Sequence, residues 1–219
     1  MKSLAIVSGG MDSVTLAYWL ATQSKAVDIL SFDYGQRHVK ELKMARLCAD
    51  RLDAQFDVID LRGIGSMLYN SLTDDCLNVP DGHYTDRTMR LTVVQNRNAI
   101  MLSIAFGIAA SRNIDAVAIG VHSGDHAIYP DCRIEFIQAF DKMEREALGE
   151  WWNVRLIAPF VDKTKAGIVE IGTKLDVPFV NTWSCYKGGD VHCGSCGTCV
   201  ERKEAFVNAG VDDPTTYLS

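Results

Sequence analysis

The 219-residue sequence contains no uninterrupted apolar run of the roughly 18 residues that a membrane-spanning helix requires. It also lacks an excess of basic residues, since 22 Lys and Arg stand against 28 Asp and Glu and the net charge is −6. Nucleic-acid binding depends mainly on basic side chains that neutralise phosphates, so this balance argues against a nucleic-acid coat protein. Repeats and low-complexity tracts are absent, and a content of 47% hydrophobic residues excludes an intrinsically disordered chain.

A secretory signal and a secreted disulfide framework are also missing. Glycines follow the first apolar stretch too soon for a signal peptide, so we expect a cytoplasmic protein. A disulfide framework would spread its cysteines through the fold and would usually have an even number, whereas this chain has seven. Four of them crowd into fifteen residues near the C-terminus: Cys185, Cys193, Cys196 and Cys199. Such a cluster indicates metal binding.

The spacing of these four cysteines suits a tetrahedral zinc ion. Two overlapping C-x-x-C turns place three thiolates on one loop, and Cys185 completes the tetrahedron. Four thiolates leave no position open for water, so we expect one structural zinc rather than a catalytic one. The alternatives are His192 in place of Cys185, an iron–sulfur cluster and a redox cysteine pair. Zinc knuckles also bind nucleic acid, but the nearby basic residues Lys187, Arg202 and Lys203 form only a thin basic patch.

Short apolar runs alternate along the chain with amphipathic segments. The apolar runs predict strands at residues 4–7, 27–34, 56–61, 115–121 and 154–158. The other segments predict helices at residues 14–21, 38–53, 98–112, 134–148 and 165–175. Strands that take turns with helices indicate an α/β fold with a doubly wound parallel sheet, which binds ligands where its strand order reverses. Residues 62–90 are rich in turn formers and predict a lid or an insertion.

The segment from Ser8 to Ser13, with the sequence Ser-Gly-Gly-Met-Asp-Ser, follows the first expected strand and opens the first expected helix. Two glycines allow a sharp turn and a close approach to a ligand, and the amides at the helix start form an anion site. The two serines add hydroxyl donors, and Asp12 is a natural partner for the magnesium ion of a nucleotide. The segment is neither a Walker A motif nor a dinucleotide fingerprint. The alternative interpretation is a tight turn followed by a capped helix.

This segment resembles the pyrophosphate-binding loop of the ATP pyrophosphatase (PP-loop) superfamily, whose members adenylate a carbonyl oxygen and release pyrophosphate. The resemblance implies an N-type, adenine nucleotide alpha hydrolase-like fold over residues 1–180, with residues 181–219 as a zinc-binding segment packed on the same domain. It also implies ATP with Mg²⁺ as co-substrate. The residues expected to bind the nucleotide are Ser8, Gly9, Gly10, Met11, Asp12, Ser13 and Val14.

Further sequence motifs narrow the resemblance from the superfamily to one family. Phe-Asp-Tyr-Gly-Gln-Arg-His at 32–38, Asn-Arg-Asn at 96–98 and Tyr-Pro-Asp-Cys-Arg at 129–133, with the cysteine cluster, resemble the 7-cyano-7-deazaguanine synthase family of queuosine biosynthesis. The resemblance covers nearly the whole chain. It implies a homodimeric carbon–nitrogen ligase that converts 7-carboxy-7-deazaguanine, ammonia and ATP to the nitrile (preQ0) through adenylated acid and amide intermediates. Because the sequence shows no glutaminase-like domain, we expect free ammonium, or ammonia from another protein, as the nitrogen source.

Individual residues acquire expected roles from this resemblance and from their chemistry. The expected catalytic residues are Asp12, Arg97, Asp131, Arg133 and Lys165. The expected substrate contacts are Tyr34, Arg37, His38, Tyr129, Asp131 and Arg133. A guanine-like ring needs an acidic acceptor and a carboxylate favours arginine, so Asp131 and Arg133 would read the base edge and clamp the carboxylate, in either order. The structural alternatives are a helix cap at Arg97, a surface salt pair at Asp131 and Arg133, a solvated Lys165 and a core position for Tyr129.

Two positions depart from the family pattern: Gln95 stands where proline is more common, and Gly167 replaces a common glutamate. These departures leave open a relative that attaches a deazaguanine to a macromolecule. A PP-loop enzyme that modifies tRNA is a second alternative, against which the net charge of −6 argues. A zinc-knuckle binding module without ATP turnover is a third, and it leaves the glycine loop unexplained.

Overall fold

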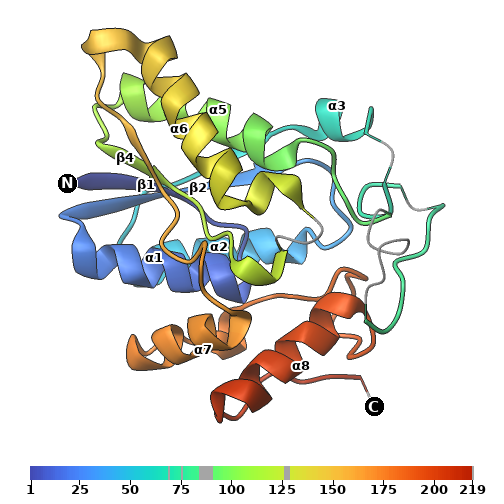
Figure 1. Cartoon of the computed structure of the whole chain (residues 1–219). Helices are drawn as coiled ribbons and strands as arrows, with labels where there is room; N and C mark the ends of the chain where they lie inside the picture. Colours follow the sequence, from blue (N-terminus) through green and yellow to red (C-terminus); the bar gives the residue numbers. More distant parts are fainter. Residues whose placement is uncertain (69, 75, 84–90, 126–128, 219) are drawn as a thin grey trace.

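A parallel sheet lies at the centre of the molecule, with helices on both of its sides (Figure 1). The computed structural model describes residues 1–68, 70–74, 76–83, 91–125 and 129–218. The sheet has five strands in the order β3-β2-β1-β4-β5. The strands are β1 (Lys2–Ile6), β2 (Ala26–Asp33), β3 (Phe56–Asp60), β4 (Ala116–Ala118) and β5 (Arg155–Ile157). The predicted doubly wound α/β fold is confirmed.

The strand order reverses beside β1. After β1 the chain builds outward through β2 and β3, and it then returns to place β4 on the other edge of β1. Ala5 of β1 therefore pairs with Ile29 on one side and with Ala118 on the other. These central strands are buried on both faces, which explains why their sequences read as short continuous apolar runs. The loops that leave the carboxyl ends of β1 and β4 border the crevice at this reversal point, where sheets of this type bind ligands.

Two groups of helices lie on the two sides of the sheet (Figure 1). On one side are α5 (Arg97–Ser111) and α6 (Ile134–Leu148). On the other are α1 (Met11–Gln23), α2 (Lys40–Arg51), α7 (Lys165–Lys174) and α8 (Gly197–Ala209). Shorter segments are α3 (Arg62–Gly65) and the 3-10 turns η1 (Ser123–Asp125), η2 (Pro130–Cys132), η3 (Gly149–Trp151) and η4 (Phe179–Asn181). Over the described ranges, no helix combines the length and the apolar character needed to cross a membrane.

The core consists of one apolar cluster on each side of the sheet. Under α5 and α6, Phe106 packs with residues of β1 and β4. On the opposite side, Leu16 of α1, Ile168 of α7 and Phe206 of α8 belong to a second cluster. Phe206 meets the ring of Phe179 edge-on, with 5.1 Å between the ring centroids. Helix α8 is therefore part of the core.

Most predicted elements are present, and the sequence analysis misses the short α3 and the longer α8. Helix α6 has the predicted bounds, whereas β4 and β5 are shorter than predicted. The overlapping C-x-x-C spacing at the start of α8 predicts a metal-binding loop, and it does not predict the helix that continues from it. Its N-cap is Cys196, which makes no capping hydrogen bond through its side chain, so no usual start signal precedes the helix.

The expected lid at 62–90 is only partly visible, because residues 69, 75 and 84–90 lie outside the described residues. The described residues between 62 and 83 contain α3 and a series of turns. Arg37 holds these turns in place: its Nη2 donates hydrogen bonds to the carbonyl oxygens of Asp74 (2.5 Å) and Leu77 (2.7 Å).

Candidate functional site

The glycine loop (residues 8–13) forms the turn between β1 and α1, at the reversal point of the sheet. Ser13 Oγ accepts hydrogen bonds from the amides of Ser8 (3.2 Å) and Gly9 (3.3 Å), and it donates to the Gly10 carbonyl oxygen (3.1 Å). Ser8 Oγ accepts from the Gly10 amide at 3.3 Å. The two serines thus fix the shape of the loop. Since the first amides of a helix lack partners within it, the start of α1 provides an anion site.

Gly9 is required by the packing of this loop against α2. Its φ is +100°, and a Cβ atom at this position would lie 2.0 Å from the carbonyl oxygen of Glu41. No side chain fits there unless the first turn of α2 moves. The glycine loop therefore lies directly on the start of α2, which brings Glu41 to the same site.

The carboxylate of Asp12 is only partly engaged. Its Oδ1 is buried and has no hydrogen-bond partner among the residues that the structure describes. Its Oδ2 lies 3.9 Å from Lys165 Nζ and 3.9 Å from His122 Nε2. A buried polar atom without a partner costs free energy unless a ligand satisfies it. The orphaned oxygen therefore fits a hard cation, which prefers oxygen ligands.

Lys165 connects the glycine loop with the C-terminal helix. It is the first residue of α7, and its Nζ lies 3.0 Å from Glu201 Oε2 on α8. The N-cap of α7 is Thr164, whose Oγ1 accepts a hydrogen bond from the Gly167 amide at 3.1 Å. The same Nζ faces Asp12, so the lysine stands between two carboxylates from different parts of the chain.

A cavity opens beyond the carboxyl ends of β1, β2 and β4, beside the glycine loop. The loop contributes Ser8, Gly10, Met11, Asp12 and Ser13 to its lining. Other polar residues that line it are Tyr34, His38, Glu41, Arg97, His122, Tyr129, Lys165, Tyr186 and Glu201. Residues from the first strand turn to the last helix therefore meet in one cavity.

Arg97 is the first residue of α5, and its Nη1 donates to the Tyr34 hydroxyl at 3.5 Å. Burial raises the pKa of Tyr34 to about 12, so this phenol stays protonated at neutral pH. The turn that carries Arg97 is held by Asp131, whose Oδ2 accepts a hydrogen bond from the Asn98 amide at 3.1 Å. Asn98 Nδ2 donates back to the Asp131 carbonyl oxygen at 3.1 Å. The helix cap is thus supplied by Asp131 from a distant segment, not by an asparagine beside Arg97.

Glu41 and His38 are buried next to each other in the cavity wall. Burial raises the pKa of Glu41 to about 8, although the charge of Arg97 and a hydrogen bond from Gln36 act against this rise. Burial, together with the charge of Arg97, lowers the pKa of His38 to about 3. Glu41 Oε1 accepts from Gln36 Nε2 at 3.1 Å and lies 3.5 Å from His38 Nε2. Both residues are therefore largely uncharged near neutral pH.

Several expected contact residues do not belong to the described lining of the cavity. Arg37 instead holds the turns that follow α3, and Asp131 caps α5. Arg133 is exposed at the N-cap of α6. Gly9 packs against α2, and Val14 is buried in the core.

Sequence reasoning missed two carboxylates of the cavity, Glu41 and Glu201. A glutamate in the first turn of a helix usually interacts with the helix dipole in contact with solvent, so Glu41 carries no signal of burial. Its one available signal is its place shortly after the carboxyl end of β2. Glu201 lies in α8, the helix that the sequence analysis does not predict.

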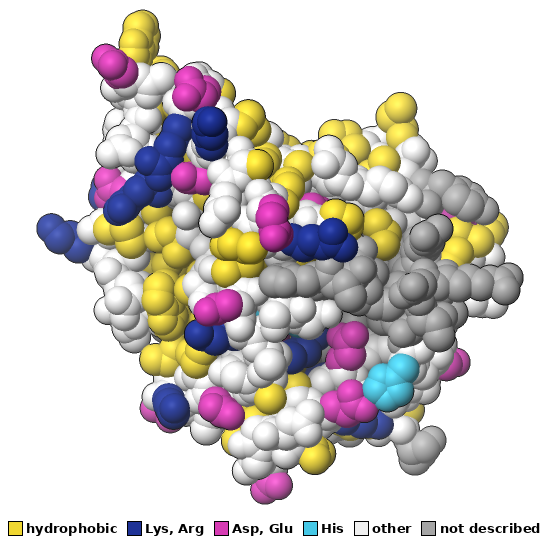
Figure 2. Space-filling view, in the orientation of Figure 1, with side chains coloured by type: hydrophobic (Ala, Val, Ile, Leu, Met, Phe, Trp, Pro, Cys, Tyr) yellow, Lys and Arg dark blue, Asp and Glu magenta, His cyan; other side chains and the backbone are white. Residues whose placement is uncertain are grey.

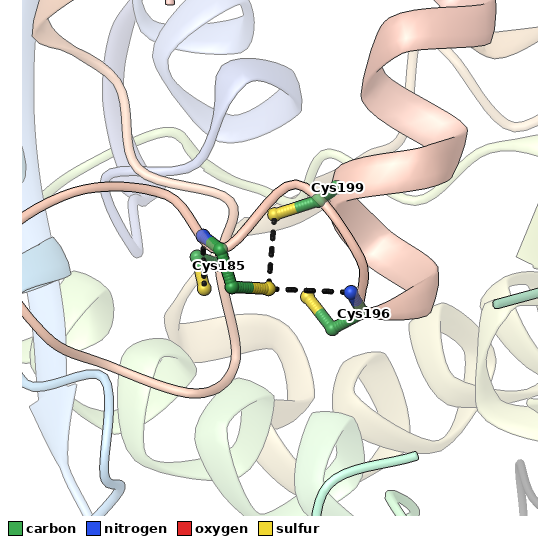
Figure 3. Close-up of side chains that lie close together, drawn as sticks. Cys185, Cys196 and Cys199 are labelled. Carbon is green, nitrogen blue, oxygen red and sulfur yellow. Dashed lines mark hydrogen bonds between the residues drawn. The ribbon is translucent and has the colours of Figure 1, made fainter. Parts of the chain in front are cut away.

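The four clustered cysteines converge at the start of α8. Their Sγ atoms all lie within 4.8 Å of one another, and Cys193 Sγ is 3.9 Å from Cys199 Sγ. Figure 3 shows the sulfur atoms of Cys185, Cys196 and Cys199 pointing toward one another. Backbone amides donate to the sulfurs, with the Cys196 amide 3.2 Å from Cys193 Sγ and the Cys193 amide 3.4 Å from Cys185 Sγ. Such N–H···S bonds favour thiolates, so the cluster is suited to hold a metal.

His192 is not part of this cluster among the described residues. Its Nε2 accepts a hydrogen bond from the Ser184 amide at 3.1 Å, and its ring packs on Trp183 with 4.2 Å between centroids. The side chain is therefore already used in the packing of the loop, and the alternative in which His192 replaces Cys185 is not supported.

Arg202 connects α8 with residues 179–182 through hydrogen bonds. Its side chain is fully buried, and it donates to Thr182 Oγ1 (2.8 Å) and to the Phe179 carbonyl oxygen (3.0 Å). Its Nε lies 3.3 Å from Asp213 Oδ1. The cysteine cluster and this buried arginine lie at the two sides of the first turns of α8, the helix that carries Glu201.

The thin basic patch expected beside the cysteines is reduced further in the structure, where two of its three residues are exposed. Arg202 is buried, Lys187 Nζ pairs with Asp81 at 2.5 Å, and Lys203 Nζ lies 4.3 Å from the ring centroid of Tyr217. On the face drawn in Figure 2, basic and acidic side chains are interspersed over α7 and α8. The sequence placed three basic residues close together along the chain, but folding directs them to different partners.

Comparisons with known proteins agree with the geometry. The family model described as "Queuosine biosynthesis protein QueC" matches residues 2–210. A 7-cyano-7-deazaguanine synthase from Brucella ovis is 58% identical over 217 residues, which cover 99% of this chain and 94% of the relative. A protein of the same name from Rhizobium johnstonii is also 58% identical over 217 residues and is covered to 92%.

Solved structures share the fold at low sequence identity. A predicted subunit of a tRNA methyltransferase from Methanocaldococcus jannaschii has a TM-score of 0.51 at 17% identity, covering 79% of this chain and 74% of that chain. The U34-tRNA thiolase NcsA from Methanococcus maripaludis has a TM-score of 0.50 at 13% identity, covering 95% of this chain and 67% of that chain. At these identities the likeness concerns the fold alone.

Proposed function

The chain belongs to the QueC family of queuosine biosynthesis proteins, and from this membership we propose that it is a carbon–nitrogen ligase that makes 7-cyano-7-deazaguanine. Its substrates are 7-carboxy-7-deazaguanine, ammonia and ATP, and its other products are AMP and pyrophosphate. The observation that carries the proposal is the cavity at the reversal point of the sheet. An anion-binding helix start, the partly engaged Asp12 and the guanidinium of Arg97 lie together there.

The glycine loop and the start of α1 are suited to the phosphates of ATP. Their amides and the hydroxyls of Ser8 and Ser13 are donors for phosphate oxygens, and Lys165 brings positive charge to the same end of the cavity. Negative charge develops on the phosphates as the bond between the α and β phosphates breaks, and donors that are already in place stabilise it. Asp12, with its orphaned oxygen, would hold the Mg²⁺ ion that offsets part of this charge.

Adenylation makes the acid reactive. A carboxylate is a poor electrophile with no good leaving group, so one of its oxygens is first joined to AMP. Ammonia then displaces AMP and forms the amide. A second adenylation, on the amide oxygen, allows AMP to leave as the nitrile forms. Both half-reactions join an oxygen to the same phosphorus, so one cavity serves both.

Arg97 is suited to hold the substrate carboxylate, because a guanidinium binds carboxylates through paired hydrogen bonds. Its place beside Tyr34 in the cavity supports this role. Tyr129 adds an aromatic surface for the deazaguanine ring, and its hydroxyl lies 3.3 Å from Thr92 Oγ1. Asp131 acts through the cap that it provides for α5, and it is therefore a positioning residue for Arg97.

We infer zinc as the metal of the cysteine cluster. Sulfur atoms that all lie within 4.8 Å of one another suit a single ion, since a Zn–S bond of about 2.3 Å places tetrahedral sulfurs about 3.8 Å apart. A four-iron cluster would instead hold each thiolate on a different iron atom. Four thiolates fill the zinc shell, so the ion is structural.

Mass spectrometry of the purified protein with Mg-ATP, ammonium and 7-carboxy-7-deazaguanine tests the proposal. We expect the nitrile, with AMP and pyrophosphate formed alongside. A reaction that halts at the amide would favour the relative that uses a deazaguanine for another purpose, and Gln95→Pro would then be the first variant to examine. No acid-dependent AMP from a folded, metal-loaded protein would overturn the proposal.

A further inference from the structure

The amidation step needs a proton acceptor. Ammonium predominates in neutral water, but only ammonia has the lone pair that attacks an adenylated carboxylate. A base must therefore take a proton from the bound nitrogen before the C–N bond forms. The titratable side chains that line the described cavity and that can accept a proton are Asp12, His38, Glu41, His122 and Glu201.

Four of these five groups are unsuited to the task. Asp12 and Glu201 both face the Lys165 ammonium, at 3.9 Å and 3.0 Å from Nζ, so both carboxylates are already engaged by a cation. His38 is buried beside Arg97, and its pKa of about 3 also makes it a weak base. His122 Nδ1 accepts a hydrogen bond from the Gly124 amide at 3.1 Å, and its Nε2 lies 3.9 Å from Asp12 Oδ2, so both ring nitrogens are directed at other groups.

Glu41 differs from them because one of its oxygens is fixed while the other is open. Gln36 Nε2 donates to Glu41 Oε1 at 3.1 Å and to the Phe32 carbonyl oxygen at 3.1 Å, and Gln36 Oε1 accepts from the Tyr34 amide at 2.9 Å. Gln36 is thus locked, and it orients the carboxyl group of Glu41. Glu41 Oε2 makes no hydrogen bond among the described residues and is not sealed from the cavity that Glu41 lines.

We propose that the ionised form of Glu41 binds ammonium through Oε2 and accepts its proton in the amidation half-reaction, an inference that rests on the proposed function. The proton moves from nitrogen to Oε2, and its bonding pair becomes the lone pair of ammonia. The nitrogen then bonds to the carbonyl carbon as the bond from that carbon to the AMP oxygen breaks and AMP leaves with the electron pair. Loss of one more proton to water gives the neutral amide.

The surroundings of Glu41 agree with this role. The charged group that faces it is Arg97 of α5, the candidate for holding the substrate carboxylate, so the proton acceptor and the reacting carbon share one end of the cavity. His38 and Tyr34 beside it are uncharged at neutral pH. Burial raises the pKa of Glu41 to about 8, and Arg97 moderates the rise. The ammonium cation favours the ionised form of Glu41 when it binds. A carboxylate of that basicity takes up a proton near neutral pH more readily than an ordinary solvated glutamate does.

Glu41→Gln tests the inference because it keeps the shape of the side chain and removes its basicity. We expect amide formation from ammonium to fall by about 100-fold or more. Acid-dependent exchange of pyrophosphate into ATP, which needs no ammonium, should stay close to the wild-type rate. The matched control is Glu144→Gln, since Glu144 of α6 is also a buried glutamate whose pKa is raised by burial, yet it does not line the described cavity. It should leave both rates unchanged.

Hydroxylamine separates a proton acceptor from a merely structural residue. It is uncharged at neutral pH and attacks acyl adenylates without prior deprotonation. We expect E41Q to form the hydroxamate at nearly the wild-type rate, so that the ratio of the ammonium rate to the hydroxylamine rate falls by about 100-fold. Equal losses with both nucleophiles, or no loss with either, would overturn the inference while leaving the proposed function intact. A wild-type protein without acid-dependent exchange would overturn both.

Glu41→Asp is the second variant, for the case that E41Q does not fold. It keeps a carboxylate but withdraws it by one methylene group from the cavity. We expect a raised KM for ammonium and an almost unchanged reaction with hydroxylamine. An equal effect of E41D on both nucleophiles would count against the inference.

Discussion

At the scale of single residues, the orphaned oxygen of Asp12 predicts a specific loss of activity. Asp12→Asn keeps the shape of the side chain but removes the charge that a cation at Oδ1 needs. We expect acid-dependent exchange of pyrophosphate into ATP to fall on the order of 100-fold. The melting temperature should not fall, because the buried carboxylate leaves one oxygen without a partner in the wild type.

The matched control for this variant is Asp50→Asn. Asp50 is exposed on α2 and lies 3.9 Å from Arg46, far from the lining of the cavity. Neither exchange nor melting temperature should change in this control. If D12N retained the exchange rate of the wild type, Asp12 would not be a ligand of the nucleotide-bound cation.

The roles of some site residues could be predicted from the sequence, and those of others could not. The glycine loop could be located because glycine, serine and aspartate between a strand and a helix have few structural uses. The role of Glu41 could not be predicted, because only the folded chain brings the start of α2 against the glycine loop at Gly9. Asp131 was given a substrate role because the sequence does not show that its carboxylate accepts the Asn98 amide at the start of α5.

At the scale of elements, the contact between the glycine loop and α2 depends on the absence of one Cβ atom. Gly9→Ala would place that atom 2.0 Å from the Glu41 carbonyl oxygen, in a backbone with a φ of +100°. We expect a loss of about 3 kcal/mol or more in the free energy of unfolding, measured by urea titration.

Gly10→Ala is the control within the same loop. Its Cβ would lie 3.4 Å from Ser8 Oγ and meets no backbone atom more closely, so its effect on stability should be below about 1 kcal/mol. Because Gly10 lines the cavity, this variant would still impair nucleotide binding. Equal stabilities of the two variants would show that α2 moves freely away from the loop.

The alternating elements could be predicted from the sequence because buried parallel strands and their helices have distinct patterns. Helix α8 could not, since its position depends on thiolates that converge only in the folded chain and on the buried Arg202. The four cysteines could be recognised in the sequence. The helix that starts among them is visible only in the structure.

At the scale of the whole molecule, removal of the metal should affect both stability and catalysis. A chelator takes away the ion that fixes the start of α8, and Glu201 on that helix then no longer orients Lys165. We expect a lower melting temperature, a loss of helical circular dichroism and a loss of pyrophosphate exchange, all restored by added zinc. Cys199→Ser should reproduce these losses, whereas Cys76→Ser, at an exposed cysteine outside the cluster, should not.

Stability should also depend on pH through two buried groups with opposite signs. The pKa of His38 falls from 6.5 to about 3, so between these values the unfolded chain binds a proton that the folded one rejects, and stability rises with pH. The pKa of Glu41 rises from 4.5 to about 8, so the folded chain keeps a proton that the unfolded one loses, and stability falls with rising pH over that range. The two effects oppose each other between pH 4.5 and pH 6.5, and above pH 6.5 only the decline due to Glu41 remains.

Urea unfolding of the metal-loaded protein checks this dependence. Between pH 6.5 and pH 8 we expect the wild type to lose about 1 to 2 kcal/mol more than E41Q. Parallel declines in the two proteins would mean that Glu41 is ionised in the folded state throughout this range.

The cavity is lined by residues as far apart in the sequence as Ser8 and Glu201. Translation proceeds from the N-terminus, so all five strands are synthesised before α8. The catalytic site is therefore completed late in translation, after the strands of the sheet have been synthesised. A message truncated before the codons for α8 would encode the entire sheet and the glycine loop, but not the carboxylate that orients Lys165.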